Sequence, residues 1–311
     1  MPRFSIVMPC FNAAATLSAT LESIGRQSFA DWELICVDDG STDASRLLLA
    51  ERAARDPRII PVCNPGKGPS DARNYGALSI AQGQIIAFCD ADDIWLPNKL
   101  VELDRAFDDQ QLDAAFGQIA FFDGAPDRVR VTSTVPDGPV SIAMLLGENP
   151  VCTMSNLSLR TEAFRATGGF ATDMVHNEDL EWLIRLVGNG ARLQGQDSLQ
   201  VWYRTSAGGL SSDLDAMRAG RERAIATARH FGASPDTRAE AIHLRYLARR
   251  ALRLDHDPRL RAARDVPLAS GPGGSRWRLS DPTRRRRAGL GTRSPRLQAA
   301  PRWRPDRPGG A

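Results

Sequence analysis

The first 125 residues of the 311-residue chain alternate between short runs rich in β-branched residues and longer stretches with apolar residues at helical spacing. The short runs predict strands, and the stretches between them predict helices. This alternation favours β-α-β units, a mainly parallel central sheet flanked by helices, and therefore an α/β fold. The predicted strands are 4–9, 33–39, 58–63, 84–90 and 114–122, and the predicted helices are 14–27, 43–55, 70–82 and 97–108.

Beyond residue 125 the apolar pattern is less regular. The expected elements are a short helix near 139–147, a strand near 152–160, a helix at about 178–188 and a strand near 199–204. We expect them to extend and cover the same sheet. Two further helices are predicted in 213–254, the first ending at a glycine stop. The sequence therefore predicts an α/β domain over 1–210 and a C-terminal helical extension over 211–254.

Residues 255–311 differ in composition from the rest of the chain. They contain 14 Arg, no Lys and 5 Asp, a net charge of +9, so the whole-chain net charge of +3 leaves −6 for 1–254. Eight Pro, seven Gly and the lack of a sustained apolar period predict a disordered basic tail. Such a tail can make peripheral contact with an anionic membrane. The alternative is a solvated extension, and no specific nucleic-acid partner is expected.

The chain also carries signals about its compartment. No stretch approaches the roughly 20 apolar residues that span a bilayer, and the amino terminus lacks the layout of a signal peptide. Five cysteines are scattered without close metal-binding pairs: Cys10, Cys36, Cys63, Cys89 and Cys152. Buried, reduced thiols are expected. We therefore predict a cytoplasmic protein, with any peripheral contact at the inner face of the membrane.

The run AFCDADDIW places three carboxylates, Asp90, Asp92 and Asp93, directly after a predicted strand. Ionised carboxylates repel one another and are poorly tolerated near a core unless a cation or hydrogen bonds compensate them. On an extended segment Asp90 and Asp92 would leave on one face, where they could bind Mg²⁺ or Mn²⁺. Alternatively, these acids solubilise the loop or cap the helix that begins near Pro97.

A second acidic pair, Asp38 and Asp39, follows the apolar run ELICV and precedes GSTD. Either carboxylate could accept hydrogen bonds from a nucleotide base or ribose, or both could simply form the turn. Asp43 is the better candidate for a helix cap. Ligands of open α/β sheets bind outside the carboxyl ends of the strands. The loops PCFN, DDGSTD and DADD should therefore gather around one crevice.

Residues 64–76, NPGKGPSDARNYG, combine glycines with a lysine and an arginine. Such a loop can approach a phosphorylated ligand closely and offer backbone N–H groups and cationic donors. It lacks the spacing GxxxxGK[ST] of a P-loop, so it does not support classical ATP hydrolysis. Arg73 is the better candidate for an anion contact, and an ordinary surface arginine is the alternative.

A third acidic pair, Glu178 and Asp179, lies at the start of a helix with an apolar stripe and follows Gly168 and Gly169. Carboxylates in a first helical turn are favoured by the helix dipole, which is a sufficient structural reason for them. The glycine-containing loop beside them also allows a general base at the wall of a pocket. His176 is expected to be a solvated loop histidine.

The order of these motifs resembles that of the family 2 glycosyltransferases, which have the GT-A fold. The segments that carry the resemblance are FSIVMPCFNAAATLSATLESIGRQSFADWELICVDDGSTDAS, GPSDARNYGALSIAQGQIIAFCDADDIWLPNKL, GGF and NEDLEWLIRL, within about 3–205. The resemblance implies that 1–210 is a GT-A catalytic domain. It also implies inverting transfer of a sugar from a nucleotide-diphosphate donor to a hydroxyl acceptor, with Mg²⁺ or Mn²⁺ as cofactor.

The resemblance implies roles for individual residues. The donor-binding positions are Pro9, Asn12, Asp38, Asp39, Arg73, Asp90, Tyr203 and Arg204, and the acceptor-side positions are Gly169, Trp182 and Arg185. Of the first acidic pair, Asp39 is chosen for base recognition. The family's DxD element corresponds to DAD, so Asp92 would hold the metal with Asp90 beside it. The family's base is the second residue of an ED pair, here Asp179, with Glu178 preceding it.

The expected reaction is transfer from a nucleotide sugar, with UDP-sugar as the expected donor, to a glycan or lipid-linked hydroxyl in polysaccharide synthesis. Two alternatives stay open. A sugar-phosphate nucleotidyltransferase would need a glycine-rich triphosphate loop near the amino terminus, which PCFNAAATL does not provide. A catalytically silent nucleotide-sugar-binding or membrane-associated scaffold would not need both DAD and NED.

Overall fold

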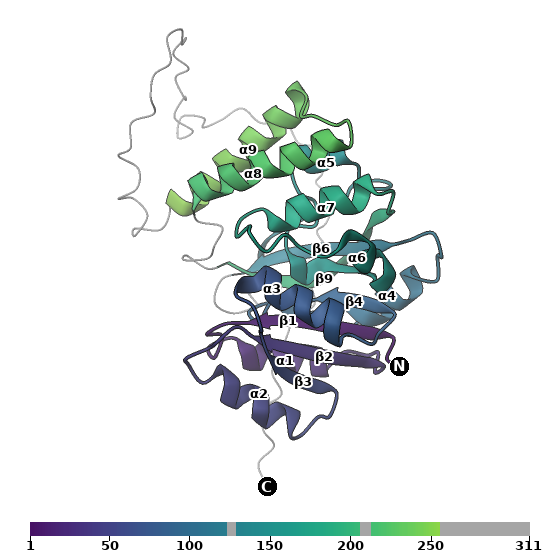
Figure 1. Ribbon diagram of the computed structural model, residues 1–311, viewed down its shortest axis with the longest axis vertical. Helices are drawn as coiled ribbons and strands as arrows, with labels where there is room; N and C mark the ends of the chain where they lie inside the picture. Colours follow the sequence, from purple (N-terminus) through teal and green to yellow (C-terminus); the bar gives the residue numbers. More distant parts are fainter. Residues whose placement is uncertain (123–128, 206–212, 256–311) are drawn as a thin grey trace, which may run out of the picture. The chain divides into compact units, whose positions relative to one another are not determined.

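The computed structural model describes residues 1–122, 129–205 and 213–255, and the predicted tail beyond Asp255 lies outside them. Its strands are β1 (Phe4–Cys10), β2 (Trp32–Asp38), β3 (Ile59–Cys63), β4 (Ile85–Phe88), β5 (Ile94–Trp95), β6 (Ala114–Phe122), β7 (Val129–Thr132), β8 (Leu157–Arg160) and β9 (Leu193–Arg204). Within the described residues they form one sheet in the order β3-β2-β1-β4-β8-β6-β9-β5, with β7 paired to β6 (Figure 1).

Helices cover the sheet. They are α1 (Leu17–Gly25), α2 (Ser45–Ala53), α3 (Gly68–Asn74), α4 (Lys99–Ala106), α5 (Ile142–Gly147), α6 (Thr161–Thr167), α7 (Glu178–Gly188), α8 (Leu214–His230) and α9 (Thr237–Asp255), together with a π-helix (Tyr75–Ile80) and a 3₁₀-helix (Met154–Asn156). The α/β fold and the two C-terminal helices predicted from sequence are both present. Among the described helices, none combines the length and the apolar character needed to cross a membrane.

The amino-terminal part of the sheet, β3-β2-β1-β4, is parallel throughout. Every residue of β2 is buried, as expected for a strand covered on both faces. In this register Cys10 at the end of β1 lies opposite Asp38 at the end of β2. The carboxyl ends of these strands therefore meet at one edge of the sheet, which is where the acidic loops begin.

The rest of the sheet is mixed. β8 runs antiparallel to both of its neighbours, β4 and β6, while β9 is parallel to β6 and antiparallel to β5. The antiparallel β8 brings the residues that precede it to the same edge at which β4 ends. The predicted parallel arrangement therefore holds for the first half of the sheet. The second half contains both parallel and antiparallel pairs of strands.

Two apolar layers lie on opposite faces of the sheet. Side chains of a strand alternate between faces, so Val7 joins the layer under α3, α6 and α7. Ile6 and Met8 join the layer under α1, α2 and α4. Burial of both faces explains why β1, β2 and β4 read as nearly continuous apolar runs, whereas the edge strand β3 is partly exposed.

Several boundaries differ from those predicted. The predicted helix 70–82 begins at Gly68 and widens into a π-helix at Tyr75, and the predicted strand 152–160 begins with a 3₁₀ turn. The predicted strand 84–90 ends at Phe88 because the chain turns at the acidic loop. Three short elements were not predicted: β5 with two residues, β7 with four and α6 with seven. Each is too short to show a clear period.

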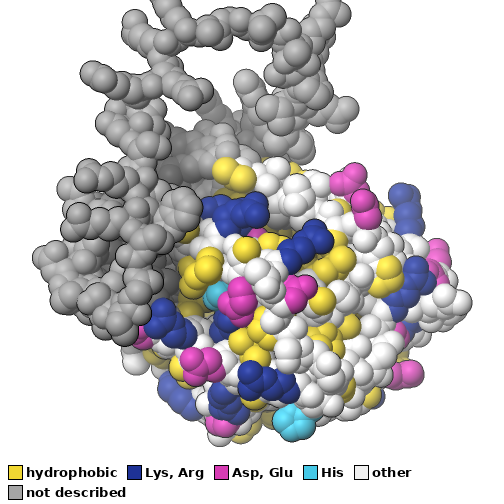
Figure 2. All heavy atoms as spheres, turned by 90° about the horizontal axis from the view of Figure 1, so that it is seen from above, with side chains coloured by type: hydrophobic (Ala, Val, Ile, Leu, Met, Phe, Trp, Pro, Cys, Tyr) yellow, Lys and Arg dark blue, Asp and Glu magenta, His cyan; other side chains and the backbone are white. Residues whose placement is uncertain are grey.

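Helix α8 packs against α7, and α9 lies beside α8 (Figure 1). Ion pairs join both helices to residues that precede them in the chain. Arg223 of α8 pairs with Asp173 at 2.9 Å, and Arg249 of α9 pairs with Glu148 at 2.6 Å. Viewed from this end, basic, acidic and hydrophobic side chains are interspersed (Figure 2). Residues Met1–Leu254, which include both helices except for the last residue of α9, form one compact unit.

Candidate active site

The acidic loop after β4 is a turn rather than the extended segment expected from sequence. The Asp93 N–H donates to the Asp90 carbonyl oxygen at 3.3 Å, which closes the turn. The backbone N–H of Asp90 donates to Ser155 Oγ at 2.8 Å, and Thr153 Oγ donates to Asp90 Oδ2 at 3.3 Å. The segment before β8 therefore fixes both the backbone and the carboxylate of Asp90.

Arg73 connects this loop to the third acidic pair. Its Nη2 lies 2.7 Å from Asp90 Oδ1 and its Nη1 lies 3.4 Å from Glu178 Oε1. The side chain is buried, and burial by itself disfavours its charge. Asp90 and Glu178 overcome that effect and raise the pKa of Arg73. Arg73 is therefore a buried, permanently charged bridge between Asp90, 17 positions away from it in the chain, and Glu178, 105 positions away from it.

The pair Glu178 and Asp179 begins α7. Asp179 Oδ1 accepts the backbone N–H of Leu180 at 2.8 Å, and Asp179 Oδ2 accepts from Asn149 Nδ2 at 3.2 Å. Burial, and then the neighbouring Asp179, raise the pKa of Glu178 to about 7. Burial also raises the pKa of Asp179 above its usual value. Both groups are thus easier to protonate than solvated carboxylates.

The two residues of the first acidic pair, Asp38 and Asp39, lie in different environments. Asp38 accepts backbone N–H groups of Gly40 and Ser41 at 3.2–3.3 Å, so it holds its own turn. The Asp39 carboxylate accepts from Asn64 Nδ2 at 2.7 Å and from the Gly68 N–H at 2.9 Å. Asp39 therefore joins the turn after β2 to the glycine-containing loop that leads to Arg73.

The loop after β1 lies against the turn after β2. Asn12 has a positive φ of 48°, and its Oδ1 accepts the backbone N–H of Thr42 at 2.8 Å. Its own N–H donates to Ser41 Oγ at 2.9 Å. Pro9 lies in β1 opposite Val37. The gathering of the loops after β1 and β2 expected from sequence is therefore present.

The end of β9 reaches the acidic loop from the other side. The backbone N–H of Arg204 donates to Asp93 Oδ1 and its Nε donates to the Asp92 carbonyl oxygen, both at 2.9 Å. Burial, and then Asp90, raise the pKa of Asp92 to about 6. Tyr203 packs edge-on against Phe121, with ring centroids 5.6 Å apart. Arg204 is thus adjacent to DAD, whereas the Tyr203 ring lies in the apolar layer.

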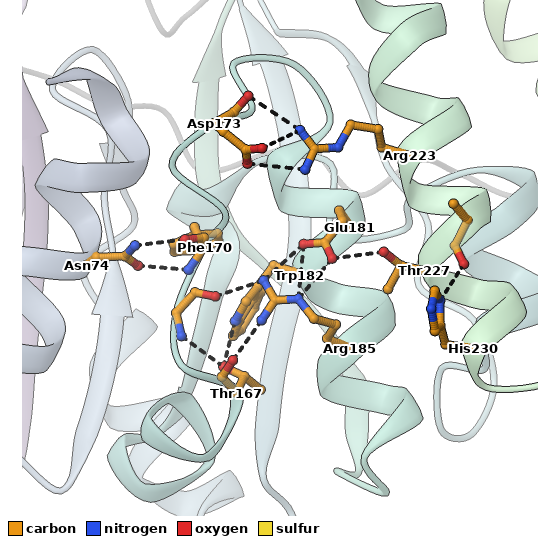
Figure 3. Close-up of polar contacts among 12 residues, drawn as sticks. Asn74, Thr167, Phe170, Asp173, Glu181, Trp182, Arg185, Arg223, Thr227 and His230 are labelled. Carbon is orange, nitrogen blue, oxygen red and sulfur yellow. Dashed lines mark hydrogen bonds and ion pairs between the residues drawn. The ribbon is translucent and has the colours of Figure 1, made fainter.

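Gly169, Trp182 and Arg185, the three positions expected on the acceptor side, make contacts within the protein, and Figure 3 shows those of Trp182 and Arg185. Trp182 has no exposed surface, and its Nε1 donates to Thr167 Oγ1 at 2.8 Å. Arg185 donates to the carbonyl oxygens of Thr167 and Gly169 at 2.7 and 2.8 Å. A side chain at Gly169 would strike Asn74. Trp182 and Arg185 therefore shape the loop before α7, and Trp182 has no surface with which to touch an acceptor.

Sequence reasoning did not single out Asn74, Asn149, Thr153 or Ser155. Asn74 exchanges two hydrogen bonds of 2.8 Å with the backbone of Phe170, which joins α3 to the loop before α7 (Figure 3). The other three contact Asp179 or Asp90. For Asn149, Thr153 and Ser155 the available signal was a cluster of polar residues in NPVCTMSN, which overlaps the start of the predicted strand 152–160, and that cluster has no spacing typical of a site.

The metal prediction can be tested against the side chains present. Within the ranges that the structure describes, no group of three or more His, Cys, Asp or Glu residues is arranged to hold a metal ion. Asp90 and Asp92 nevertheless supply two hard oxygen donors, and their mutual repulsion is one cause of the raised pKa of Asp92. Mg²⁺ is commonly bound through one or two carboxylates together with substrate phosphates. The donor set fits such a cation.

Sheet order and the clustering of acidic loops at one sheet edge define the protein as an α/β protein with the fold of the GT-A glycosyltransferases. The chain matches S. aureus TarS (residues 1–349) in complex with UDP-GlcNAc with a TM-score of 0.56 and 19% identity, over 75% of this chain and 73% of that one. It matches mannosyltransferase PcManGT from Pyrobaculum calidifontis, in complex with GDP-Man and Mn²⁺, with a TM-score of 0.56 and 20% identity, over 86% and 76%.

The chain belongs to glycosyl transferase family 2, whose family model matches residues 5–168. A relative with the name UDP-Glc:alpha-D-GlcNAc-diphosphoundecaprenol beta-1,3-glucosyltransferase WfgD, from Escherichia coli, is 46% identical over 97 residues, which is 31% of this chain and 37% of that protein. The matched stretches cover 37%, 41% and 54% of the lengths of three such curated relatives. The resemblance stated from sequence is thereby confirmed at the level of family and fold.

Proposed function

We propose that this chain is an inverting glycosyltransferase that moves a sugar from a nucleotide-diphosphate donor to a hydroxyl acceptor. Membership of glycosyl transferase family 2 supports the reaction class. The observation that carries the proposal is the bridge of Arg73 between Asp90 and Glu178. It joins the loop proposed to face the donor to the helix turn proposed to supply the base.

On the donor side we assign base recognition to Asp39, as the resemblance to the family implies; its carboxylate also joins the turn after β2 to the loop that leads to Arg73. Asp90 would contact the ribose, and Arg73 would lie beside the diphosphate, where its Nε is buried without a hydrogen-bond partner. Pro9, Asn12 and the backbone of the adjacent loops would line the nucleotide. Arg204 would act from the end of β9, whereas Tyr203 would contribute through packing.

Asp92 and Asp90 would hold Mg²⁺ or Mn²⁺ in this proposal. When bound, such an ion stabilises the negative charge that develops on the departing diphosphate. The chain's own contribution to the same task is the fixed positive charge of Arg73. A preorganised cation in a site with little water stabilises developing charge more than it would in bulk solvent.

On the acceptor side we assign the general base to Asp179. Its carboxylate would take the proton of the acceptor hydroxyl as that oxygen attacks the anomeric carbon from the face opposite the diphosphate. The bond between the anomeric carbon and the diphosphate oxygen breaks with its electron pair, so the configuration inverts. The raised pKa of Asp179 suits a proton acceptor. Glu178 is less suitable because its carboxylate is paired with Arg73.

UDP-sugar is the proposed donor, and a lipid-linked or glycan hydroxyl is the proposed acceptor. The name of the relative WfgD includes UDP-Glc and a diphosphoundecaprenol, and one structural neighbour is bound to UDP-GlcNAc, while another is bound to GDP-Man. A lipid-linked acceptor would place the reaction at the cytoplasmic face of a membrane. Polysaccharide synthesis is the process that such an activity would serve.

The test is a transfer and hydrolysis assay of the purified chain with UDP-Glc, UDP-GlcNAc and GDP-Man in the presence of Mn²⁺. Asp179→Asn and Asp92→Asn should each abolish turnover while the thermal midpoint stays near that of the wild type. Asp173→Asn, at an exposed aspartate, is the matched control and should remain active. Normal turnover of either site variant would refute its assigned role. Donor binding without turnover over a broad acceptor panel would instead indicate the binding scaffold.

A further inference from the structure

The 149–155 segment, which connects α5 to the 3₁₀-helix before β8, contacts both acidic ends of the candidate site. At its start, Asn149 Nδ2 donates to Asp179 Oδ2 at 3.2 Å. Near its end, Thr153 and Ser155 hold the carboxylate and backbone of Asp90. Seven consecutive residues therefore connect the proposed base with the loop proposed to face the donor.

The orientation of the Asn149 amide follows from its second hydrogen bond. Asn149 Oδ1 accepts the backbone N–H of Val151 at 3.0 Å, so the amide nitrogen is the atom turned toward Asp179. A carboxylate accepts hydrogen bonds when ionised, so this contact favours the charged form of Asp179. The Val151 carbonyl in turn accepts from the Thr153 N–H at 2.9 Å and from Asn156 Nδ2 at 3.1 Å. Asn149 thus lies in a segment whose conformation is fixed by several hydrogen bonds.

We propose that Asn149 is a positioning residue that keeps the Asp179 carboxylate ionised and directed toward the acceptor hydroxyl. This inference rests on the proposed function, because it concerns the base of that reaction. Asn149 touches neither sugar nor nucleotide in the proposal. It acts through Asp179.

The charges around Asp179 explain why a neutral donor is useful there. Among the described groups that face Asp179, Glu178 on the same helix and Asp90 on the acidic loop are acidic, while Arg73 is positive. Arg73 is already paired with both of those other carboxylates. A second cation beside Asp179 would stabilise its ionised carboxylate more strongly. It would also lower the pKa of Asp179 and so make it a weaker base. An amide N–H stabilises the ionised form with a smaller effect on basicity.

The decisive variant is Asn149→Asp. It retains an oxygen that can accept the Val151 N–H, but it removes the donor and places a like charge beside Asp179. The pKa of Asp179 should rise, so the acidic limb of the pH profile of kcat/KM should move upward by at least about one pH unit. The KM for the nucleotide sugar should change little, because the donor side is not touched. Asn149→Ala should shift the limb in the same direction without adding charge.

Asn98→Asp is the matched control, because it makes the same charge change at the start of α4, where Asn98 Oδ1 accepts from Ser28 Oγ at 3.1 Å. Its pH profile should equal that of the wild type. A folded Asn149→Asp variant with an unshifted acidic limb would overturn the inference. If that variant does not fold, an unshifted limb in Asn149→Ala overturns it equally.

A second measurement separates this inference from the proposed function. Carboxyl ¹³C NMR of aspartate-labelled protein, with the Asp179 resonance identified by its loss in Asp179→Asn, reports the titration of Asp179 without turnover. We expect this titration at higher pH in Asn149→Asp than in the wild type and Asn98→Asp. If the wild type transfers no sugar, the proposed function fails, while an unchanged titration of Asp179 in Asn149→Asp would refute the inference.

Discussion

Arg73 Nη2 lies 2.7 Å from Asp90 Oδ1, and this ion pair joins α3 to the turn that follows β4. The same guanidinium reaches Glu178 at the start of α7. A buried cation between two carboxylates from distant parts of the chain gives the site a definite geometry before any ligand binds. The predictions below follow from this arrangement and from the loop that precedes α7.

Replacement of Arg73 should affect both stability and activity. Arg73→Met leaves Asp90 and Glu178 without their cation, so we expect the free energy of unfolding to fall by about 3 kcal/mol and turnover to fall at least about 100-fold. Arg26→Met removes a pair with Glu22 whose side chains are about 40% exposed. That control should lose less than about 1 kcal/mol. Equal losses in urea unfolding would contradict a special role for the Arg73 bridge.

Glu178 should make stability depend on pH. Its pKa of about 7 in the folded protein lies above that of an unfolded-chain glutamate. Between about pH 4.5 and 7 the folded state therefore binds a proton that the unfolded state has lost, so the free energy of unfolding falls as pH rises. Between pH 5 and pH 8 the free energy of unfolding of the wild type should fall by up to about 3 kcal/mol more than that of Glu178→Gln. Urea unfolding at both pH values checks this, with Glu22→Gln, at a partly exposed glutamate, expected to follow the wild type.

Metal removal should stop the proposed reaction. EDTA is expected to abolish sugar transfer, and added Mn²⁺ or Mg²⁺ should restore it. Asp92→Asn deletes one of two proposed oxygen ligands, so any residual activity should need at least about tenfold more Mn²⁺ for half-saturation. Asp173→Asn should require the same Mn²⁺ concentration as the wild type. Full turnover in EDTA would refute the metal proposal but leave the transferase proposal in place.

The two glycines before α7 should differ in their tolerance of a side chain. Both have positive φ, 74° at Gly168 and 83° at Gly169, but an added Cβ at Gly168 meets open space, whereas one at Gly169 would clash with Asn74 Oδ1. Gly168→Ala should cost about 1–2 kcal/mol for its backbone conformation alone. Gly169→Ala should cost about 2 kcal/mol more, because Asn74 must move. Similar urea midpoints for the two variants would argue against the Asn74 contact.

Much of the fold was predictable from local pattern. The run ELICVDD predicted β2, the helical stripe after Glu178 predicted α7, and both were found close to their expected bounds. The approach of the loops after β1 and β2 was also predictable, because parallel strands present their carboxyl ends at one edge. The direction of β8 was not, since an apolar run has the same pattern in a parallel or an antiparallel strand.

The candidate site was predictable as a set of residue types and less so as an arrangement. DAD stood out because its carboxylates follow an apolar run, Arg73 because it lies in a glycine-containing loop, and the ED pair because it begins a helix, while their individual roles were implied by the resemblance to family 2 glycosyltransferases. Asn149 did not, because a single asparagine between two elements carries no period and no charge. Trp182 looked available for an acceptor, but its position on the helix turns it into the core.

By itself, the sequence determined which segments are buried, which end in carboxylates, and that these carboxylates need compensation, because these properties depend on neighbours along the chain. Only the tertiary structure decided that Arg73 lies between Asp90 and Glu178 and that Asn149 faces Asp179. Such contacts join residues 17 to 105 positions apart. Their geometry depends on how strands and helices pack, and packing is a property of the whole folded chain.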